Sequence, residues 1–201
     1  MDHFQPELFR FLEELKTNNT REWFQANRDR HRSQVQEPLL EFIAAFAEPL
    51  GVISPHFVAS PKPVGGSMFR IYRDVRFSRD KSPYKTHAAA QFRHREGRDV
   101  HAPGFYLHLE PDNVFMGAGL WHPPGPTLKS VRNAIVDQSH RWRRATAKLD
   151  LGGDSLKRGP NGFDPDHPLI EDLKRKDFVT MTKSSRKAAC SPGFMDEFVG
   201  A

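Results

Sequence analysis

The chain has 201 residues, of which 37% are aliphatic or aromatic and 27% are charged. This length suffices for one domain with a stable core, and apolar residues mixed with charges of both signs exclude a disordered chain. No apolar run reaches the roughly 20 residues that span a bilayer, and the N-terminus has no basic region followed by a hydrophobic stretch. We therefore expect a cytoplasmic protein with no membrane partner, and the single Cys190 fits a reducing compartment.

The net charge of +5 is unevenly distributed along the chain. Between Arg70 and Arg98, nine Arg or Lys residues stand against three acidic residues, so the basic excess lies in one segment. A basic excess concentrated in this way is typical of a surface that binds anions.

The first 51 residues predict helices. Apolar residues recur every three or four positions from Phe4 to Leu15, where Asn18-Asn19-Thr20 ends the pattern. Asn19 with Glu22 three positions later predicts a capping box for a second helix, and Pro38 predicts a kink or the start of a third. These helices are expected to be scaffold.

Beyond Gly65-Gly66 the apolar period changes from helical to alternating. Four strands separated by short turns, and a possible fifth, are predicted at 67–77, 86–94, 104–110, 114–121 and 178–182. Such a succession of short strands indicates an antiparallel meander. Gly117 and Gly119 fall on one strand face, where a neighbouring group can approach closely.

The C-terminal part predicts helices again. Apolar positions from Leu128 to Trp142 indicate one long helix after the proline-rich run 123–126, with shorter helices opening at 166–168 and after Pro192. The sum is an α+β fold, an antiparallel β meander of about four to five strands packed with N-terminal and C-terminal helices. We expect a single domain over residues 1–201, with N-terminal helices at 1–51, the sheet and a cationic motif at 57–121, and C-terminal helices at 126–201.

Residues 70–85, with the sequence RIYRDVRFSRDKSPYK, form what we call the cationic segment. A strand here places Arg73 on the apolar face with Phe69, Ile71, Val75 and Phe77, where a guanidinium needs a carboxylate partner or marks the end of the strand. Turn-forming residues and Pro83 follow Phe77 and predict a loop, so the expected path is strand, loop, strand.

The cationic segment has two interpretations. As an oxyanion site, arginine forks bind phosphate or carboxylate, lysine adds a point charge and tyrosine adds a neutral donor. The predicted ligand-binding residues are Arg70, Arg73, Arg76, Lys81 and Tyr84, and the predicted partner is a phosphorylated small molecule or nucleotide. As a purely structural feature, the segment uses Arg–Asp pairs to hold the loop to the sheet, with Arg73 and Asp74 as the expected pair.

The spacing within this segment resembles that of a known family. Arg70-x-x-Arg73-Asp74-x-Arg76-Phe77-x-x-x-Lys81-x-Pro83-Tyr84 matches all eight fixed positions of RxxRDxRFxxxKxPY, the signature of domain-of-unknown-function family 2461, found in bacteria and fungi. The likeness extends over nearly the whole chain, through Asn18-Asn19, Trp23-Phe24, 106–110, 117–121 and 159–173. It implies no activity, substrate or cofactor, because none is assigned to the family. It implies a further helical segment after 194–198, so the chain is expected to be short at its C-terminus.

Whether the protein is an enzyme is left open by the sequence. An enzyme acting on a phosphorylated substrate would use the cations to stabilise negative charge while His108, Glu110 or Asp74 moves a proton. We expect His108 to lie beside the cationic loop, hydrogen-bonded to a carboxylate such as that of Glu110. The sequence contains no nucleophile motif.

Metal and nucleic-acid ligands have weaker support. His87, His94, His101 and His108 are spaced by seven, which matches neither a helical ligand pair nor an HExxH motif, so no metal site and no cofactor are predicted. Nucleic-acid binding stays an alternative because Arg141, Arg143 and Arg144 form a basic helical patch, although the chain contains no recognised nucleic-acid module. The oligomeric state is left open.

Overall fold

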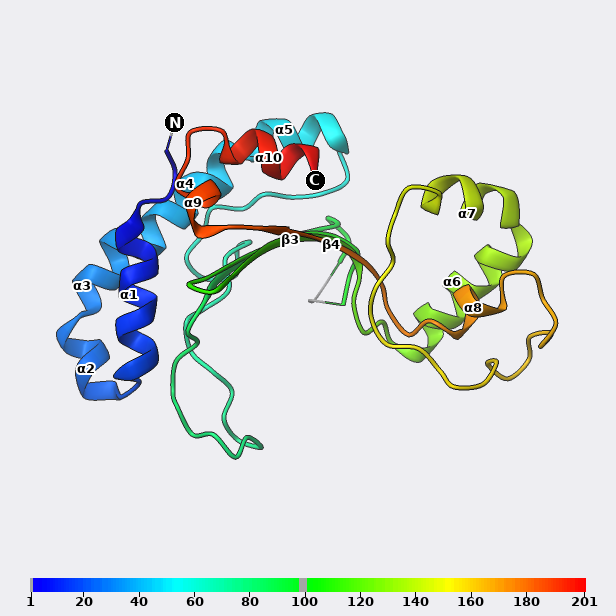
Figure 1. Ribbon diagram of the computed structural model, residues 1–201, viewed down its shortest axis with the longest axis horizontal. Helices are drawn as coiled ribbons and strands as arrows, with labels where there is room; N and C mark the ends of the chain where they lie inside the picture. Colours follow the sequence, from blue (N-terminus) through cyan, green and yellow to red (C-terminus); the bar gives the residue numbers. More distant parts are fainter. Residues whose placement is uncertain (1, 98–100) are drawn as a thin grey trace. The chain divides into compact units, whose positions relative to one another are not determined.

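The computed structural model describes residues 2–97 and 101–201 (Figure 1). One four-stranded sheet has the order β1-β2-β3-β4, so strands that follow one another along the chain are neighbours. The strands are β1 (Ala88–Arg93), β2 (Gly104–Glu110), β3 (Asn113–Leu120) and β4 (Phe178–Ser184). Helices precede the first strand and follow the third and fourth strands along the chain. The predicted α+β class and β meander are therefore confirmed.

The chain divides into two compact units. The first comprises Met1–Arg95, Phe105–Met116 and Thr182–Ala201, and the second comprises Glu96–Gly104 and Gly117–Met181. The single domain over residues 1–201 stays a prediction. Within the described residues, no helix combines the length and the apolar character needed to cross a bilayer.

The first unit contains most of the helices. They are α1 (Pro6–Thr17), α2 (Arg21–Ala26), α3 (Arg28–His31), the π-helical η1 (Arg32–Gln36), α4 (Glu37–Ala45), α5 (Ala47–Ile53), α9 (Arg186–Ala189) and α10 (Phe194–Gly200). The expected Asn19 cap is wrong, because the N-cap of α2 is Thr20, whose side chain accepts a hydrogen bond from Trp23 N at 3.2 Å. Pro38 lies in the first turn of α4, where its missing N–H leaves no helical hydrogen bond unmade.

The core of this unit determines which faces of β1 and β2 are buried. Phe198 of α10 contacts Phe46, with 4.8 Å between ring centroids, and Phe92 of β1, with 5.8 Å. Leu107 and Leu109 of β2 are fully buried in the same cluster. Because successive side chains of a strand point to opposite faces, the even-numbered residues of β2 face away from this core.

The second unit has its own small core. Its helices are α6 (Gly125–Asp137), α7 (Ser139–Thr146) and α8 (Ile170–Lys174). The predicted single long helix through Trp142 is wrong, because Gln138 leaves the helical region with φ −128° and ψ 42° and separates α6 from α7. Gly119 has φ +132°, and a Cβ there would overlap the Phe178 carbonyl oxygen, so the close approach expected at this glycine is confirmed.

Candidate functional site

The cationic segment folds back as a hairpin with an irregular stem (Figure 1). Its stem pairs through the isolated bridges Met68–Ala90 and Tyr72–Tyr84, and Lys85 N donates to Ile71 O at 2.8 Å. The two arms of the segment pair with each other, as the expected path of strand, loop and strand requires, but neither arm is a regular strand. The predicted strand at 67–77 is therefore wrong, because only isolated bridges form there and residues 74–82 form a loop.

The expected apolar face of this segment is also wrong at its outer end. Phe77 is 96% exposed, whereas Ile71 packs against the core of the first unit. The reason is local, since Ser78 N donates to Val75 O and turns the chain before a strand can continue.

Tyr84 attaches the hairpin to the N-terminal helices. The Asn19 side chain donates to Tyr84 O at 2.9 Å and accepts from Tyr84 N at 3.1 Å. The Tyr84 ring is 2% exposed and stacks on Phe24, with 4.1 Å between ring centroids. Burial raises the pKa of its hydroxyl. Tyr84 thus holds the base of the hairpin against α1 and α2.

Two arginines of the segment are paired with its own carboxylates. Arg73 binds Asp80, and Arg76 binds Asp74 through two hydrogen bonds, at 2.9 Å from Nε and 2.7 Å from Nη2. The expected pairing of Arg73 with Asp74 is wrong, because Arg73 reaches across the loop while Asp74 is taken by Arg76. Hydrogen bonds from Arg76 lower the pKa of Asp74 to about 2, and those from Ser82 and then Arg73 lower the pKa of Asp80.

The remaining cations are not neutralised in this way. Lys81 Nζ donates to the Val75 carbonyl at 2.9 Å. In the part of the chain that the structure describes, neither Arg70 nor Lys85 forms an ion pair. Lys85 Nζ lies 5.1 Å from the centroid of the Phe69 ring, and burial together with the charge of Arg70 lowers its pKa. Uncompensated positive charge is therefore present at the stem of the hairpin, on Arg70 and Lys85, as well as in its loop.

Three side chains on the outer face of β2 form a hydrogen-bonded chain, which we call the relay: Tyr106, His108 and Glu110. Tyr106 Oη lies 3.0 Å from His108 Nδ1, and His108 Nε2 lies 3.5 Å from Glu110 Oε2. The predicted hydrogen bond between His108 and Glu110 is confirmed. Because a carboxylate only accepts, Nε2 carries the hydrogen, and Nδ1 of the neutral ring accepts from the tyrosine hydroxyl. Thr86 Oγ1 donates to the other oxygen of Glu110 at 3.2 Å.

Aromatic rings enclose the relay. The ring centroid of His108 lies 4.4 Å from that of His87 and 4.7 Å from that of Phe115, which stacks on it. Burial, followed by the charges of His108 and Lys85, lowers the pKa of His87 to about 4. Burial also lowers the pKa of His108 against the opposing effect of Glu110, and raises the pKa of Tyr106 to about 12. Both imidazoles are consequently neutral at neutral pH.

The sequence also matches a known protein family over nearly its whole length. Residues 7–201 match the model of a family described as a conserved hypothetical protein, DUF2461. The chain belongs to this family. Neither the curated proteins nor the solved structures contain a significant match to it.

In this DUF2461 chain, the predicted site residues separate into two groups. Arg73, Arg76 and Tyr84 have partners that shape the hairpin, whereas Arg70 extends into solvent. Among the acid–base candidates, Asp74 is exposed with a low pKa and is a weak base, while His108 and Glu110 lie together in the relay. The charge of Lys85 is the third cause, after burial and the charge of His108, that lowers the pKa of His87, and His87 in turn contacts His108 of the relay.

Sequence reasoning missed three members of the site: His87, Tyr106 and Phe115. Tyr106 was available from the alternation Tyr-x-His-x-Glu, which places all three side chains on one strand face. His87 directly precedes β1 and Phe115 lies in β3, and their contact with His108 of β2 depends on the pairing register. Within residues 2–97 and 101–201, no cluster of three His, Cys, Asp or Glu side chains could hold a metal ion.

Proposed function

We propose that this member of the DUF2461 family binds a small ligand bearing a phosphate or carboxylate group, at the place where the stem of the cationic hairpin meets the relay. The observation that carries the proposal is the uncompensated pair of cations, Arg70 and Lys85, next to partly accessible groups that donate or exchange protons. An anion bound between the two cations would relieve their mutual repulsion and stabilise the charged form of Lys85.

Most of the other predicted ligand residues have a structural role in this proposal, because they hold the hairpin in shape. Arg73, Arg76 and Tyr84 hold the loop and its base through their own partners. Lys81 differs from them, because an ammonium group has three donors and only one is used on the Val75 carbonyl. Its other N–H groups can contact a ligand that extends from the stem, such as the remainder of a nucleotide.

An enzyme acting on a phosphorylated substrate is the second candidate, favoured by the relay. Glu110 fixes the tautomer of His108 and stabilises its protonated form, so that His108 can accept a proton from a substrate or from water. Tyr106 donates to the other nitrogen and must turn away or give up its hydrogen bond when His108 becomes protonated. No cofactor is part of this proposal.

The proposal includes a cytoplasmic location. It is supported by Cys190, a lone and half-buried thiol whose pKa is raised by burial.

Nucleic-acid binding is an alternative form of the proposal, because a nucleic acid would offer the same phosphate chemistry as a nucleotide. Its binding would weaken steeply with added salt, whereas a mononucleotide contacts few phosphates and would show a shallow dependence.

The test is a thermal-shift screen of phosphorylated metabolites, nucleotides and small carboxylates, followed by calorimetry. A ligand is expected to raise the Tm by roughly 5–11 °C at about 100 times its Kd. The increase should disappear in Arg70→Gln and in Lys85→Gln. Arg79→Gln is the matched control, because Arg79 carries the same charge on the exposed loop and forms no ion pair in the described part of the chain.

Two outcomes would count against the proposal. Stabilisation that is equal in all three variants would mean that the anion binds elsewhere or without specificity. The absence of stabilisation by any phosphate or carboxylate across a broad panel would leave the hairpin with a structural role alone.

A further inference from the structure

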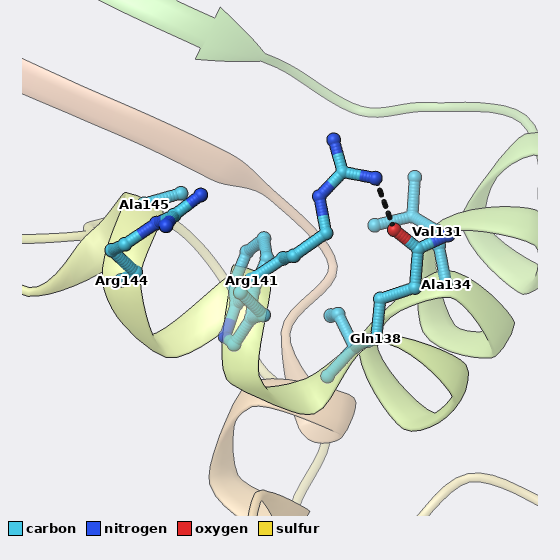
Figure 2. A pocket seen from close by; sticks show the side chains of 8 residues that line it. Val131, Ala134, Gln138, Arg141, Arg144 and Ala145 are labelled. Atoms are coloured by element: carbon cyan, nitrogen blue, oxygen red, sulfur yellow. Dashed lines mark hydrogen bonds between the residues drawn. The ribbon is translucent and has the colours of Figure 1, made fainter.

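The second unit contains a separate hollow between α6 and α7 (Figure 2). Its volume is about 490 Å³, within the range of small-molecule sites. It forms where Gln138 breaks the helical path, so that the side chains of α7 lie across from those of α6. Val131, Ala134 and Ile135 provide an apolar floor.

Arginines form the polar part of this hollow. Arg141 and Arg144 line it from α7, and Arg141 Nη1 donates to Gln138 Oε1 at 2.7 Å, which holds the guanidinium over the opening (Figure 2). Neither arginine forms an ion pair within residues 2–97 and 101–201. The sequence of α7, SHRWRRAT, contains no acidic residue. The charge at the rim is therefore positive and uncompensated.

Trp142 adds an aromatic wall. It lines the hollow and packs edge-on against Phe178, with 5.6 Å between ring centroids. Its indole Nε1 is inaccessible to solvent and has no hydrogen-bond partner among the described residues. A ligand in the hollow would therefore contact the Trp142 ring and not this donor, and the indole N–H signal would report occupancy through the ring.

We infer that this hollow binds a small organic anion with an apolar body, of the alkyl or aryl carboxylate class. The body lies on Val131, Ala134 and Ile135, and the carboxylate is held by the forks of Arg141 and Arg144. The site is independent of the proposed anion site at the cationic hairpin, because every lining residue belongs to the second unit.

The test uses hexanoate, with hexanol and acetate as matched probes that lack the charge and the apolar body. The chain has three tryptophans, so the full-length ¹⁵N-labelled protein has three indole N–H signals, and Trp142→Phe assigns one of them. Hexanoate is expected to shift the Trp142 signal saturably, with a Kd at least roughly tenfold lower than that of hexanol or acetate.

Variants locate the binding site. Arg141→Gln and Arg144→Gln are expected to weaken hexanoate binding by roughly tenfold each. Arg143→Gln removes the same charge from the same helix at a residue that does not line the hollow, and should leave the Kd within about twofold. Ala134→Leu fills the floor while keeping every charge and should abolish the shift. Well-dispersed spectra verify that each variant is folded.

Several results would overturn the inference. The first is an unshifted Trp142 signal at about 20 mM hexanoate, where even a weak site with millimolar Kd would be occupied. The second is binding of hexanol as tight as that of hexanoate. The others are a loss of affinity in Arg143→Gln equal to that in Arg141→Gln and Arg144→Gln, or wild-type affinity in Ala134→Leu.

Discussion

Asp177 Oδ1 accepts two hydrogen bonds from one residue, His122: one from its backbone N at 2.7 Å and one from its imidazole Nδ1 at 2.8 Å. The carboxylate is 1% exposed, and its other oxygen accepts from Asp154 N at 2.9 Å. Burial opposes ionisation of Asp177, but the hydrogen bonds outweigh it and lower the pKa. His122 has φ +46°, so these bonds hold a strained backbone conformation.

Replacing Asp177 by Asn is expected to destabilise the protein by about 1–3 kcal/mol at neutral pH, because an amide cannot accept all three hydrogen bonds at full strength. The folded-state pKa of Asp177 is below that of the unfolded chain, so its contribution is present above about pH 4 and is lost as pH falls further. Urea unfolding of the wild type and the variant at pH 7 and pH 3 measures both effects. Asp154→Asn is the control, because only the backbone of Asp154 is used; an equal loss there would contradict the prediction.

Replacing Asn19 by Ala is expected to cost about 1–3 kcal/mol, because both backbone polar groups of Tyr84 lose their partner. The loop 74–82 should also become more susceptible to trypsin, since the base of the hairpin is released from α1 and α2. Asn18→Ala, which removes only a hydrogen bond to Glu14 O in the same helix, should leave trypsin susceptibility unchanged. Identical cleavage rates in wild type and Asn19→Ala would show that the hairpin is held by other contacts.

Arg132 of α6 is 8% exposed and donates to the carbonyls of Leu173 and Arg175, at 2.7 Å from Nε and 3.1 Å from Nη2. These carbonyls lie at the C-terminal end of α8, where they lack helical partners. Arg132→Met is expected to destabilise the protein by about 2–4 kcal/mol. Arg132→Lys should be intermediate, since it keeps the charge but not the fork. Thermal unfolding measures the series, and an Arg132→Lys variant as stable as the wild type would exclude a role for fork geometry.

The pKa of about 4 at His87 predicts a pH dependence of stability. The unfolded chain takes up a proton near pH 6.5 while the folded His87 stays neutral, so stability decreases as pH falls from about 6.5 to 4. After allowance for solvent screening, the contribution is about 1–2 kcal/mol. His87→Gln should reduce this slope and leave the part due to His31, whose pKa burial also lowers to about 4. Unchanged slopes in urea unfolding, or an imidazole titration of His87 by NMR near pH 6.5, would refute the prediction.

The elements with strong periodicity were predictable from sequence. The four observed strands and the N-terminal helices follow from where apolar residues recur, because burial of one face decides the structure there. Short polar segments were not predictable in this way. The break at Gln138 and the irregular path of residues 67–77 depend on local hydrogen bonds and tertiary contacts that leave no apolar pattern.

Sequence reasoning found the region of the candidate site but not its division of roles. The expectation that His108 forms a hydrogen bond to a carboxylate such as that of Glu110 was correct. Which carboxylate neutralises which arginine did not follow, since Arg73, Arg76, Asp74 and Asp80 lie within eight residues and several pairings satisfy the spacing. Loop geometry selects among them.

The ion pairs of the cationic hairpin have a consequence for how a charged molecule would approach it. Both carboxylates lie in the loop 74–82 and pair with Arg73 and Arg76, so Arg79 and Lys81 keep their charge in the loop, as Arg70 and Lys85 do at the stem. The attractive potential therefore extends along the whole hairpin, and an anion would be guided to it at long range by the loop as well as by the stem. Capture at the stem would then depend on Arg70 and Lys85, whereas the rate of approach would depend on all four cations.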